Sequence, residues 1–333
     1  MIIPTTLIGC LPTHADIGWI APLLLLICRI FQGIFTAGES DGVRIFIYET
    51  IGQHRPCLVN SISGIACMAG IYLASFAYSV IMRFEAYPHA WRFAFFIGSL
   101  LGLLVFWSRG FLTETPAFVQ YLKSTNKTPK KHFFTTIIKN KKPIFSTILL
   151  CGSVGGLYHF YMVFFGHYLA NTLALSSPKT VSVYTAEALL IYTLCGPIAG
   201  LLADRFGPMR ILKISLLGLL IAAIVNTAMI NQGTVNVWVF LTTTVLISFF
   251  STPGFIVLLQ KFNVGERYRC ISIGHALGSM LFSGSTPIIS LYFWHTLKIA
   301  TAPILYFYFL ILMGFLAIFL LEYEPNAQPH GCT

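Results

Sequence analysis

Long apolar runs recur along the whole sequence, and they constrain the fold more than any other feature. Nine of them are long enough to cross a bilayer as a helix, which needs about 20 residues. They are 19–50, 58–82, 91–112, 143–173, 181–203, 209–230, 237–260, 270–295 and 300–321. Because no water inside a bilayer can satisfy exposed backbone groups, such runs fold as helices. The sequence therefore predicts an all-α, polytopic helical membrane protein.

The composition agrees with this class and excludes others. Of the 333 residues, 56% are hydrophobic and only 10% are charged, whereas soluble domains carry about 25% charged residues. Most of the basic residues behind the net charge of +10 lie between the apolar runs, where they orient helices, so they do not indicate nucleic-acid binding. The first run, 1–11, is about half as long as a spanning helix. It lacks the features of a signal peptide, and we interpret it as the end of a helix whose beginning is missing.

The basic residues predict the orientation of the spans. Loops on one side contain fourteen lysines and arginines, whereas the opposite loops contain only Arg83, Lys179 and Lys298. The positive-inside rule places the first side in the cytoplasm. We therefore expect a multi-pass protein of the plasma membrane, the inner membrane of a bacterium.

The longest connection, 113–142, contains seven lysines and divides the chain. We predict an N-terminal half at 1–112, a basic cytoplasmic central loop at 113–142, a C-terminal half of six helices at 143–321 and a cytoplasmic tail at 322–333. Within the loop, we expect an amphipathic piece at 132–138 to rest on the membrane surface.

The run 19–50 carries four charged residues where a lipid-facing helix would carry none, namely Arg29, Glu39, Asp41 and Arg44. A charged side chain at the centre of a bilayer helix costs about 2.5 to 3.5 kcal/mol, so it needs a partner or a wet cavity. On one helix, Arg29, Asp41 and Arg44 fall within an arc of about 120°, and Glu39 lies about 80° to the other side of Arg29. We therefore expect this side of the helix to face protein or water.

The sequence shows no pattern of catalytic or metal-binding residues. It contains no HExxH, no P-loop and no GxSxG, and its nine histidines are dispersed. The eight cysteines have neither CxxC nor Cys/His metal spacing. The sequence thus predicts neither an enzyme nor a site for a cofactor or metal.

One loop motif points to a family. From Gly200 the sequence reads GLLADRFGPMR. It resembles the G-x-L-a-D-R-x-G-R-K loop of the major facilitator superfamily through Gly207, after which the two expected basic residues are missing. The resemblance implies that the glycines let helices approach closely. It also implies that Asp204 and Arg205 pair with neighbouring helix ends at the cytoplasmic face, in a gating or structural role.

Motifs along almost the whole chain are similar to one branch of this family, the metabolite:proton symporters, which include proline/betaine, 2-oxoglutarate, citrate and shikimate transporters. They are LLLLICR at 23–29, GE at 38–39, WR at 91–92, ETPAF at 114–118, RY at 267–268 and LGSMLFSGSTP at 277–287. Asp41 and Arg44 stand where the proline/betaine type has uncharged residues, which leaves the substrate open.

Members of the family have twelve helices, and the run 19–50 looks like the fourth of them. Its end carries Glu49, followed by Arg55, and we expect both to brace the end of the helix. The segments of this chain align with part of the third helix and with the fourth to the twelfth. The resemblance therefore implies that the first two helices are absent.

Four residues are candidates for substrate binding: Arg29, Tyr158, His159 and His275. Arg29 lies about 15 Å into its span, near the midplane, where it could bind a carboxylate; a structural pair is the alternative. The resemblance places Tyr158 and His159 on a helix that faces the central cavity, where their polar atoms suit a polar metabolite. His275 stands at an aromatic position of the family. For these three residues, the alternative is ordinary packing.

Glu39, Asp41 and Glu187 are the candidates for proton coupling, because a carboxyl group held inside a membrane protein can carry a proton. We favour Glu39, since Arg44 follows Asp41 at i,i+3 and suits an ion pair that gates or braces the helix. Glu187 lies about six residues inside its span, so its side chain alternatively reaches the interface.

Taken together, these features predict a secondary active transporter of a small organic solute, such as proline, betaine or a dicarboxylate, by proton-coupled alternating access. Its partners would be the solute, protons and the lipid bilayer, without nucleic acid. The alternative is a non-transporting truncated remnant, or one part of a split transporter that works with a separately encoded N-terminal fragment. Because function resides in the site and not in the fold, this choice stays open.

Overall fold

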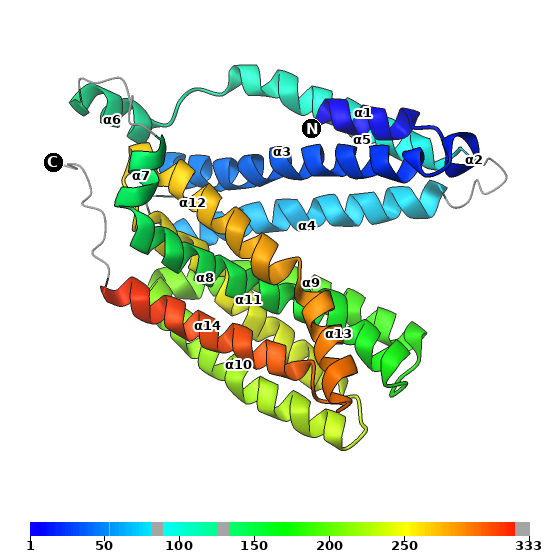
Figure 1. The fold of residues 1–333 in the computed structure, drawn as a ribbon. Helices are drawn as coiled ribbons and strands as arrows, with labels where there is room; N and C mark the ends of the chain where they lie inside the picture. Colours follow the sequence, from blue (N-terminus) through cyan, green and yellow to red (C-terminus); the bar gives the residue numbers. More distant parts are fainter. Residues whose placement is uncertain (53, 82–88, 126–132, 324–333) are drawn as a thin grey trace. The chain divides into compact units, whose positions relative to one another are not determined.

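The computed structural model describes residues 1–52, 54–81, 89–125 and 133–323, and every regular element in these ranges is a helix (Figure 1). The predicted all-α class is confirmed. Several residues used in the predictions lie outside the described ranges: Arg83, His132, the loop lysines Lys127, Lys130 and Lys131, and all but the first two residues of the tail 322–333.

The helices follow the apolar runs closely. They are α1 (Ile2–Cys10), α2 (His14–Ile17), α3 (Ile20–Thr50), α4 (Pro56–Ile81), α5 (Trp91–Ser108), η2 (Arg109–Phe111), α6 (Pro116–Thr125), α7 (Phe133–Lys139), α8 (Lys141–Tyr158), η3 (His159–Phe165), η4 (Tyr168–Thr172), α9 (Pro178–Phe206), α10 (Pro208–Asn231), α11 (Val237–Leu259), α12 (Val264–Gly278), η5 (Ser279–Ser283), α13 (Thr286–Leu297) and α14 (Ile304–Tyr323). Within the described residues, nine helical segments are long and apolar enough to cross a membrane. The prediction of nine full spans is therefore confirmed by length and composition.

The connection 113–142 contains two helices. Helix α7 corresponds to the predicted amphipathic piece 132–138 with a shift of one residue. Helix α6 was not expected. It begins at Pro116. Proline suits the first helical position, because a backbone N–H there would have no acceptor within the helix.

The internal contacts divide the chain into two compact units. One unit, here the N-terminal unit, contains residues 1–44 and 66–115; the C-terminal unit contains residues 45–65 and 116–333. The units differ from the sequence halves in one respect, because the end of α3 and the start of α4 group with the C-terminal unit. Each unit is described by itself below.

In the N-terminal unit, α1 packs along α5. The hydroxyls of Thr6 and Ser99 are hydrogen-bonded to each other, and Ser99 Oγ also lies 3.2 Å from the carbonyl oxygen of Ile2. Before α2, the Thr13 amide and hydroxyl both donate to the Asp16 carboxylate at 2.8 Å. These hydrogen bonds favour the charged carboxylate, so they hold the pKa of Asp16 below its usual value.

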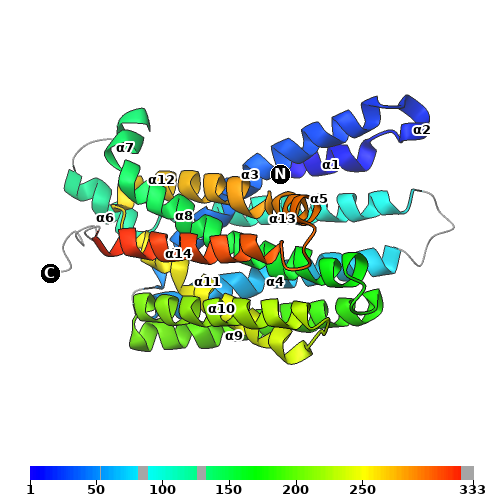
Figure 2. The ribbon, with the colours of Figure 1, turned by 60° about the horizontal axis from the view of Figure 1, so that its bottom comes forward.

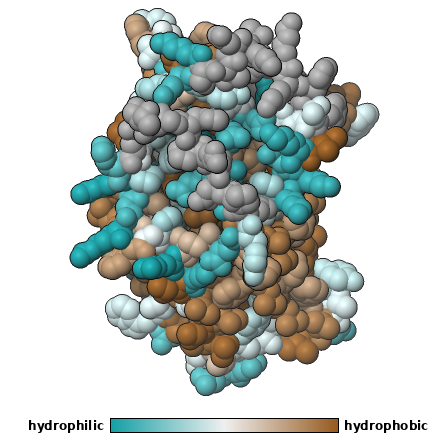
Figure 3. Space-filling model, turned by 90° about the vertical axis from the view of Figure 1, so that its left-hand side faces the viewer, coloured by the Kyte–Doolittle hydropathy of each residue, from teal (hydrophilic) through white to brown (hydrophobic). Residues whose placement is uncertain are grey.

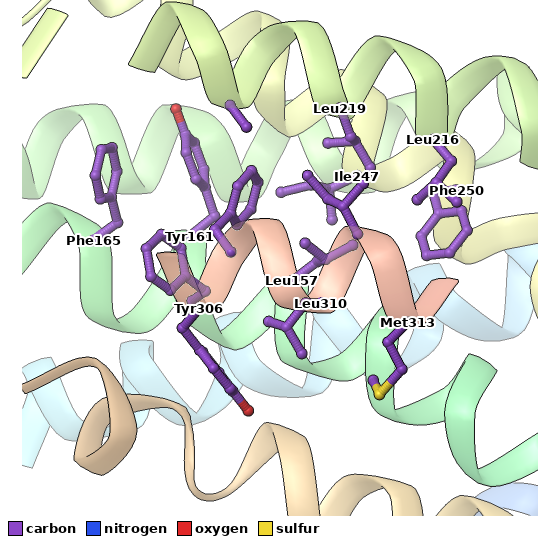
Figure 4. Close-up of a cluster of buried hydrophobic side chains, with 14 of the residues drawn as sticks. Leu157, Tyr161, Phe165, Leu216, Leu219, Ile247, Phe250, Tyr306, Leu310 and Met313 are labelled. Carbon is purple, nitrogen blue, oxygen red and sulfur yellow. The ribbon is translucent and has the colours of Figure 1, made fainter. Parts of the chain in front are cut away.

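In the C-terminal unit, α8 to α14 form a bundle, in which α10 contacts both α9 and α14 (Figure 2). Its centre is a cluster of buried apolar side chains, part of which is drawn in Figure 4. The cluster includes Leu157, Tyr161 and Phe165 from α8 and η3, Leu216 and Leu219 from α10, Ile247 and Phe250 from α11, and Tyr306, Leu310 and Met313 from α14. On the outside of the same bundle, large apolar side chains are exposed. Ile214, Ile221 and Leu312, for example, are 62 to 64% exposed, as expected for groups that face lipid.

Helices α8 and α12 approach each other closely through glycines. A Cβ on Gly278 would lie 2.5 Å from the Ile148 carbonyl oxygen and 2.9 Å from the Gly152 amide nitrogen. A Cβ on Gly152 would lie 2.5 Å from the Phe282 ring. Small residues at such crossings let helix backbones meet inside a membrane, where no hydrophobic effect drives them together.

This packing gives a stability prediction. We expect Gly278→Ala to lower the apparent unfolding temperature of the purified protein in detergent, because its methyl group would collide with backbone atoms of α8. Overpacking of this kind costs about 1 to 3 kcal/mol. Gly64→Ala is the matched control, because no atom lies within 4 Å of its added Cβ. If Gly278→Ala unfolds at the same temperature as the unchanged protein, then α8 and α12 do not approach each other as closely at Gly278 as described.

Candidate functional site

The Asp204 carboxylate binds the start of α4. The backbone amides of Cys57 and Leu58 donate to its two oxygens, each at 2.9 Å. Since α4 begins at Pro56, these amides belong to the first turn, where backbone donors lack a partner within the helix. The partial positive charge at a helix N-terminus also favours a carboxylate there.

Gly200, one turn earlier on α9, makes this contact sterically feasible. A Cβ at this position would lie 2.8 Å from both the Cys57 carbonyl oxygen and the Leu58 Cα. Gly207 ends α9 with a φ of +95°, a conformation that favours glycine. Arg205, in contrast, is exposed, and its guanidinium carbon lies 5.4 Å from the centre of the Phe206 ring.

A buried ion pair lies at the end of α3. Arg267 Nη1 donates to Glu49 Oε1 at 2.7 Å, and the two side chains are only 11% and 6% exposed. Arg267 Nε donates to the Leu259 carbonyl oxygen at 3.0 Å, and the guanidinium carbon lies 5.4 Å from the centre of the Tyr48 ring. Removing one partner of such a pair would leave an uncompensated buried charge, at a cost of about 3 to 5 kcal/mol.

We call these two contacts, the Glu49–Arg267 ion pair and the hydrogen bonds of Asp204 to the start of α4, the α3–α4 latch. They attach the two ends of one helix connection to different helices of the C-terminal unit. Asn60, farther along α4, donates to the Thr252 carbonyl oxygen at 3.0 Å and extends the contact to α11. Arg55, within the connection, is exposed. The end of this unit that carries α6 and α7 shows many hydrophilic side chains in Figure 3.

The role of Arg267 was not predicted from the sequence, where this residue supports only the orientation and the family resemblance. The signal available in the sequence was weak, because an arginine at the start of a span also fits a loop. Its partner Glu49 is 218 residues away, and no spacing rule relates two such positions.

A second cluster, of aromatic and polar side chains, lies farther along the same unit. The Tyr158 ring centre is 5.2 Å from that of Tyr192 and 5.5 Å from that of His159. The hydroxyls of Tyr192 and Ser251 are hydrogen-bonded at 2.9 Å. His159 Nδ1 lies 2.9 Å from the Gly155 carbonyl oxygen of its own helix. The structure thus brings Tyr158 and His159 together and adds Tyr192 and Ser251, which the sequence analysis did not identify.

In the N-terminal unit, Arg29 is part of a polar chain that joins α3 to α1. It donates to Gln32 Oε1 at 3.2 Å, and Gln32 Nε2 donates to Thr5 Oγ1 at 2.8 Å. The Arg29 guanidinium carbon lies 5.9 Å from the centre of the Phe95 ring. Arg29 is nevertheless an exposed side chain, so its outer nitrogen atoms can reach a further group.

Glu39 forms an ion pair with Arg109, which directly follows α5. The sequence analysis did not consider Arg109, which is 70 residues away along the chain. Asp41 is almost fully buried, at 1% exposure. Arg44, half-buried, follows it three residues later on α3. The suggested pair of Asp41 with Arg44 stays a prediction.

His275 and Glu187 are the remaining candidates. His275 is half-buried on α12, and Glu187 is exposed on α9. Within the described ranges, no group of three or more His, Cys, Asp or Glu side chains could hold a metal ion.

Comparisons with known proteins identify the family. Residues 2–269 match the family model of the Major Facilitator Superfamily. The proline/betaine transporter of Salmonella typhimurium is 26% identical over 348 aligned positions, which include all of this chain and 69% of that protein. The glycine betaine/proline/ectoine/pipecolic acid transporter OusA of Dickeya dadantii is 25% identical over the same shares of both chains.

The fold has a counterpart among solved structures. The proton:xylose symporter XylE bound to 6-bromo-6-deoxy-D-glucose, described as a major facilitator protein, superposes with a TM-score of 0.66 over 98% of this chain and 80% of its own, at 14% sequence identity. Because a family model matches most of the chain, the prediction of a multi-pass secondary transporter of small solutes rather than an enzyme is confirmed, and the protein belongs to the Major Facilitator Superfamily.

Proposed function

We propose that the protein takes up a small zwitterion of the proline or betaine type together with protons. Two relatives that align with the whole chain are named as transporters of these solutes. The observation that carries the proposal is the set of charged groups inside apolar spans, each held by a polar partner within the protein: Arg29 with Gln32, Glu39 with Arg109, and Glu49 with Arg267. Such groups are too costly in a membrane to be kept without a function.

Arg29 is the proposed ligand of the solute carboxylate. A guanidinium can bind a carboxylate through two parallel hydrogen bonds, and its contact with Gln32 uses only one nitrogen. Tyr158 and His159 would contact the solute from the C-terminal half, with His275 as a further candidate. Tyrosine rings suit the quaternary ammonium of a betaine, because cations are attracted to aromatic faces. A dicarboxylate is the alternative solute.

Glu39 is the proposed proton carrier. Its carboxylate is paired with Arg109, and a protonated carboxyl group would lose most of this attraction. Proton binding and the ion pair therefore compete, which lets a proton change the contact between α3 and the end of α5. Asp41 and Glu187 are the next candidates if Glu39 does not carry the proton.

The α3–α4 latch is the proposed gate between two halves at 1–112 and 143–321, joined by the connection 113–142. Its contacts link sequence elements of the N-terminal half, Glu49 and the start of α4, to Arg267 and Asp204 of the C-terminal half. Alternating access requires such contacts to break and re-form as the halves rock against each other. The basic loops support a location of this end, the central connection and the C-terminus in the cytoplasm, with the protein in an inner membrane.

Transport and proton coupling can be tested by solute uptake. In cells that lack their own carriers, the protein should accumulate labelled proline or glycine betaine when a proton gradient is imposed. Glu39→Gln should abolish this accumulation but retain counterflow, because solute exchange requires no net proton release. Glu322→Gln is the control, since that exposed carboxylate pairs with Lys213 at the end of α14. Accumulation by Glu39→Gln would exclude Glu39 as the carrier. Absence of any uptake, including that of dicarboxylates, would favour a non-transporting protein.

The orientation can be tested by labelling introduced cysteines from each side of the membrane. A cysteine in place of Lys123 should react with a membrane-impermeant maleimide only from the cytoplasmic side, and one in place of Lys179 only from outside. Both lysine side chains are exposed, so accessibility within the protein does not limit the reaction. The reverse pattern would overturn the positive-inside assignment.

The α3–α4 latch can be tested by labelling a buried native cysteine. Asp204→Ala should raise the labelling rate of the native Cys57 thiol, which is fully buried beside Asp204, in a background without other cysteines. The amides of Cys57 and Leu58 would lose their ionised acceptor, which costs about 1 to 3 kcal/mol. The fraction of molecules in which the start of α4 is detached would then rise roughly 5- to 150-fold. Asp204→Asn should give a smaller rise, because it keeps one acceptor oxygen. Equal labelling of all three proteins would show that Asp204 does not hold α4.

A further inference from the structure

The first turn of α12 is held by three separate segments of the chain. Three consecutive residues, Gly265, Glu266 and Arg267, each contact a different one. Tyr121 of α6 covers Gly265, Asn140 binds Glu266, and Glu49 at the end of α3 binds Arg267. Only the last of these contacts belongs to the α3–α4 latch.

The contact to Asn140 is polar and well enclosed. Glu266 is 5% exposed, and Asn140 Nδ2 donates to its Oε2 at 3.0 Å. The same amide nitrogen donates to the Thr136 carbonyl oxygen at 2.9 Å. Asn140, which directly precedes α8, thereby ties the last turn of α7 to the first turn of α12.

The contact to Tyr121 is steric. A Cβ on Gly265 would lie 2.5 to 2.6 Å from ring atoms and the hydroxyl oxygen of Tyr121. The ring therefore occupies the space that a side chain would take. It also stacks on Phe118, with ring centres 6.4 Å apart. The packing of α6 against the start of α12 therefore requires glycine at position 265.

These contacts together fix the rotation of α12. Consecutive side chains leave a helix about 100° apart, so contacts at three successive residues enclose roughly 200° of its circumference. Both Arg267 hydrogen bonds, to the Leu259 carbonyl and to Glu49, require the guanidinium in one direction. A rotation of α12 would break them, and α6 and Asn140 oppose such a rotation.

We propose that Tyr121 and Asn140 are positioning residues of the latch, and that α6 and Asn140 control the gate by holding Arg267 in register with Glu49. The inference deepens the proposed transport cycle, in which this gate opens. The connection then has a role beyond joining two halves, because a displacement of α6 or of Asn140 would open the gate without any change to a charged residue.

The test uses thiol labelling in the absence of solute, so its outcome is independent of whether the protein transports. We compare two single-cysteine backgrounds. One keeps Cys57, at the latch; the other keeps Cys151, which is buried in the apolar cluster of the bundle. Each background receives Gly265→Ala, which would push the Tyr121 ring away, or Asn140→Leu, which would remove the amide donor from Glu266.

We expect both variants to raise the labelling rate of Cys57 about tenfold and to leave that of Cys151 unchanged. Tyr121→Phe keeps the ring and Lys139→Ala changes an exposed neighbour, so both should behave like the unchanged protein. An unchanged Cys57 rate in Gly265→Ala and Asn140→Leu would overturn the proposal. So would a parallel rise at Cys57 and Cys151, because it would indicate general loosening of the unit.

Discussion

The Glu49–Arg267 ion pair is the contact on which the proposed gate depends. Two charges that are about nine-tenths buried or more are stable only while each satisfies the other, because solvation in the interior cannot replace water. Separating the two charges without the entry of water would therefore be costly. The proposed gate places this separation at the first turn of α12, where the contacts of Gly265 and Glu266 also lie.

The Asp204 hydrogen bonds depend on a different principle, the unsatisfied amides of a helix start. They need Gly200 for the close approach of the two helices, and Gly207 ends α9 three residues after Asp204. The loop motif that begins at Gly200 therefore forms the end of α9 that binds the N-terminus of α4. The end of α3 and the start of α4 consequently group with the C-terminal unit and not with the rest of their own helices.

Much of the fold could be predicted from the sequence, because hydrophobic length alone determines a membrane span. The nine spans and the family followed from the apolar runs and from local motifs. The charged pairs could not be predicted, since Glu39 with Arg109 and Glu49 with Arg267 are 70 and 218 residues apart. Local periodicity suggested the nearer partner Arg44 for Asp41 and no partner for Glu49. Helix α6 was missed because its stability comes from contacts, such as Tyr121 on Gly265, and not from a long apolar pattern.

The most direct test of the gate is a distance measurement by pulsed electron paramagnetic resonance in lipid nanodiscs. Spin labels at His54 and Arg210, both exposed, report on the α3–α4 connection and on the start of α10. We expect two distance populations whose proportions change when proline or betaine is added or the pH is lowered, with the longer distance enriched in Asp204→Ala. A single distance that responds to neither solute nor pH nor this substitution would contradict the proposed gate.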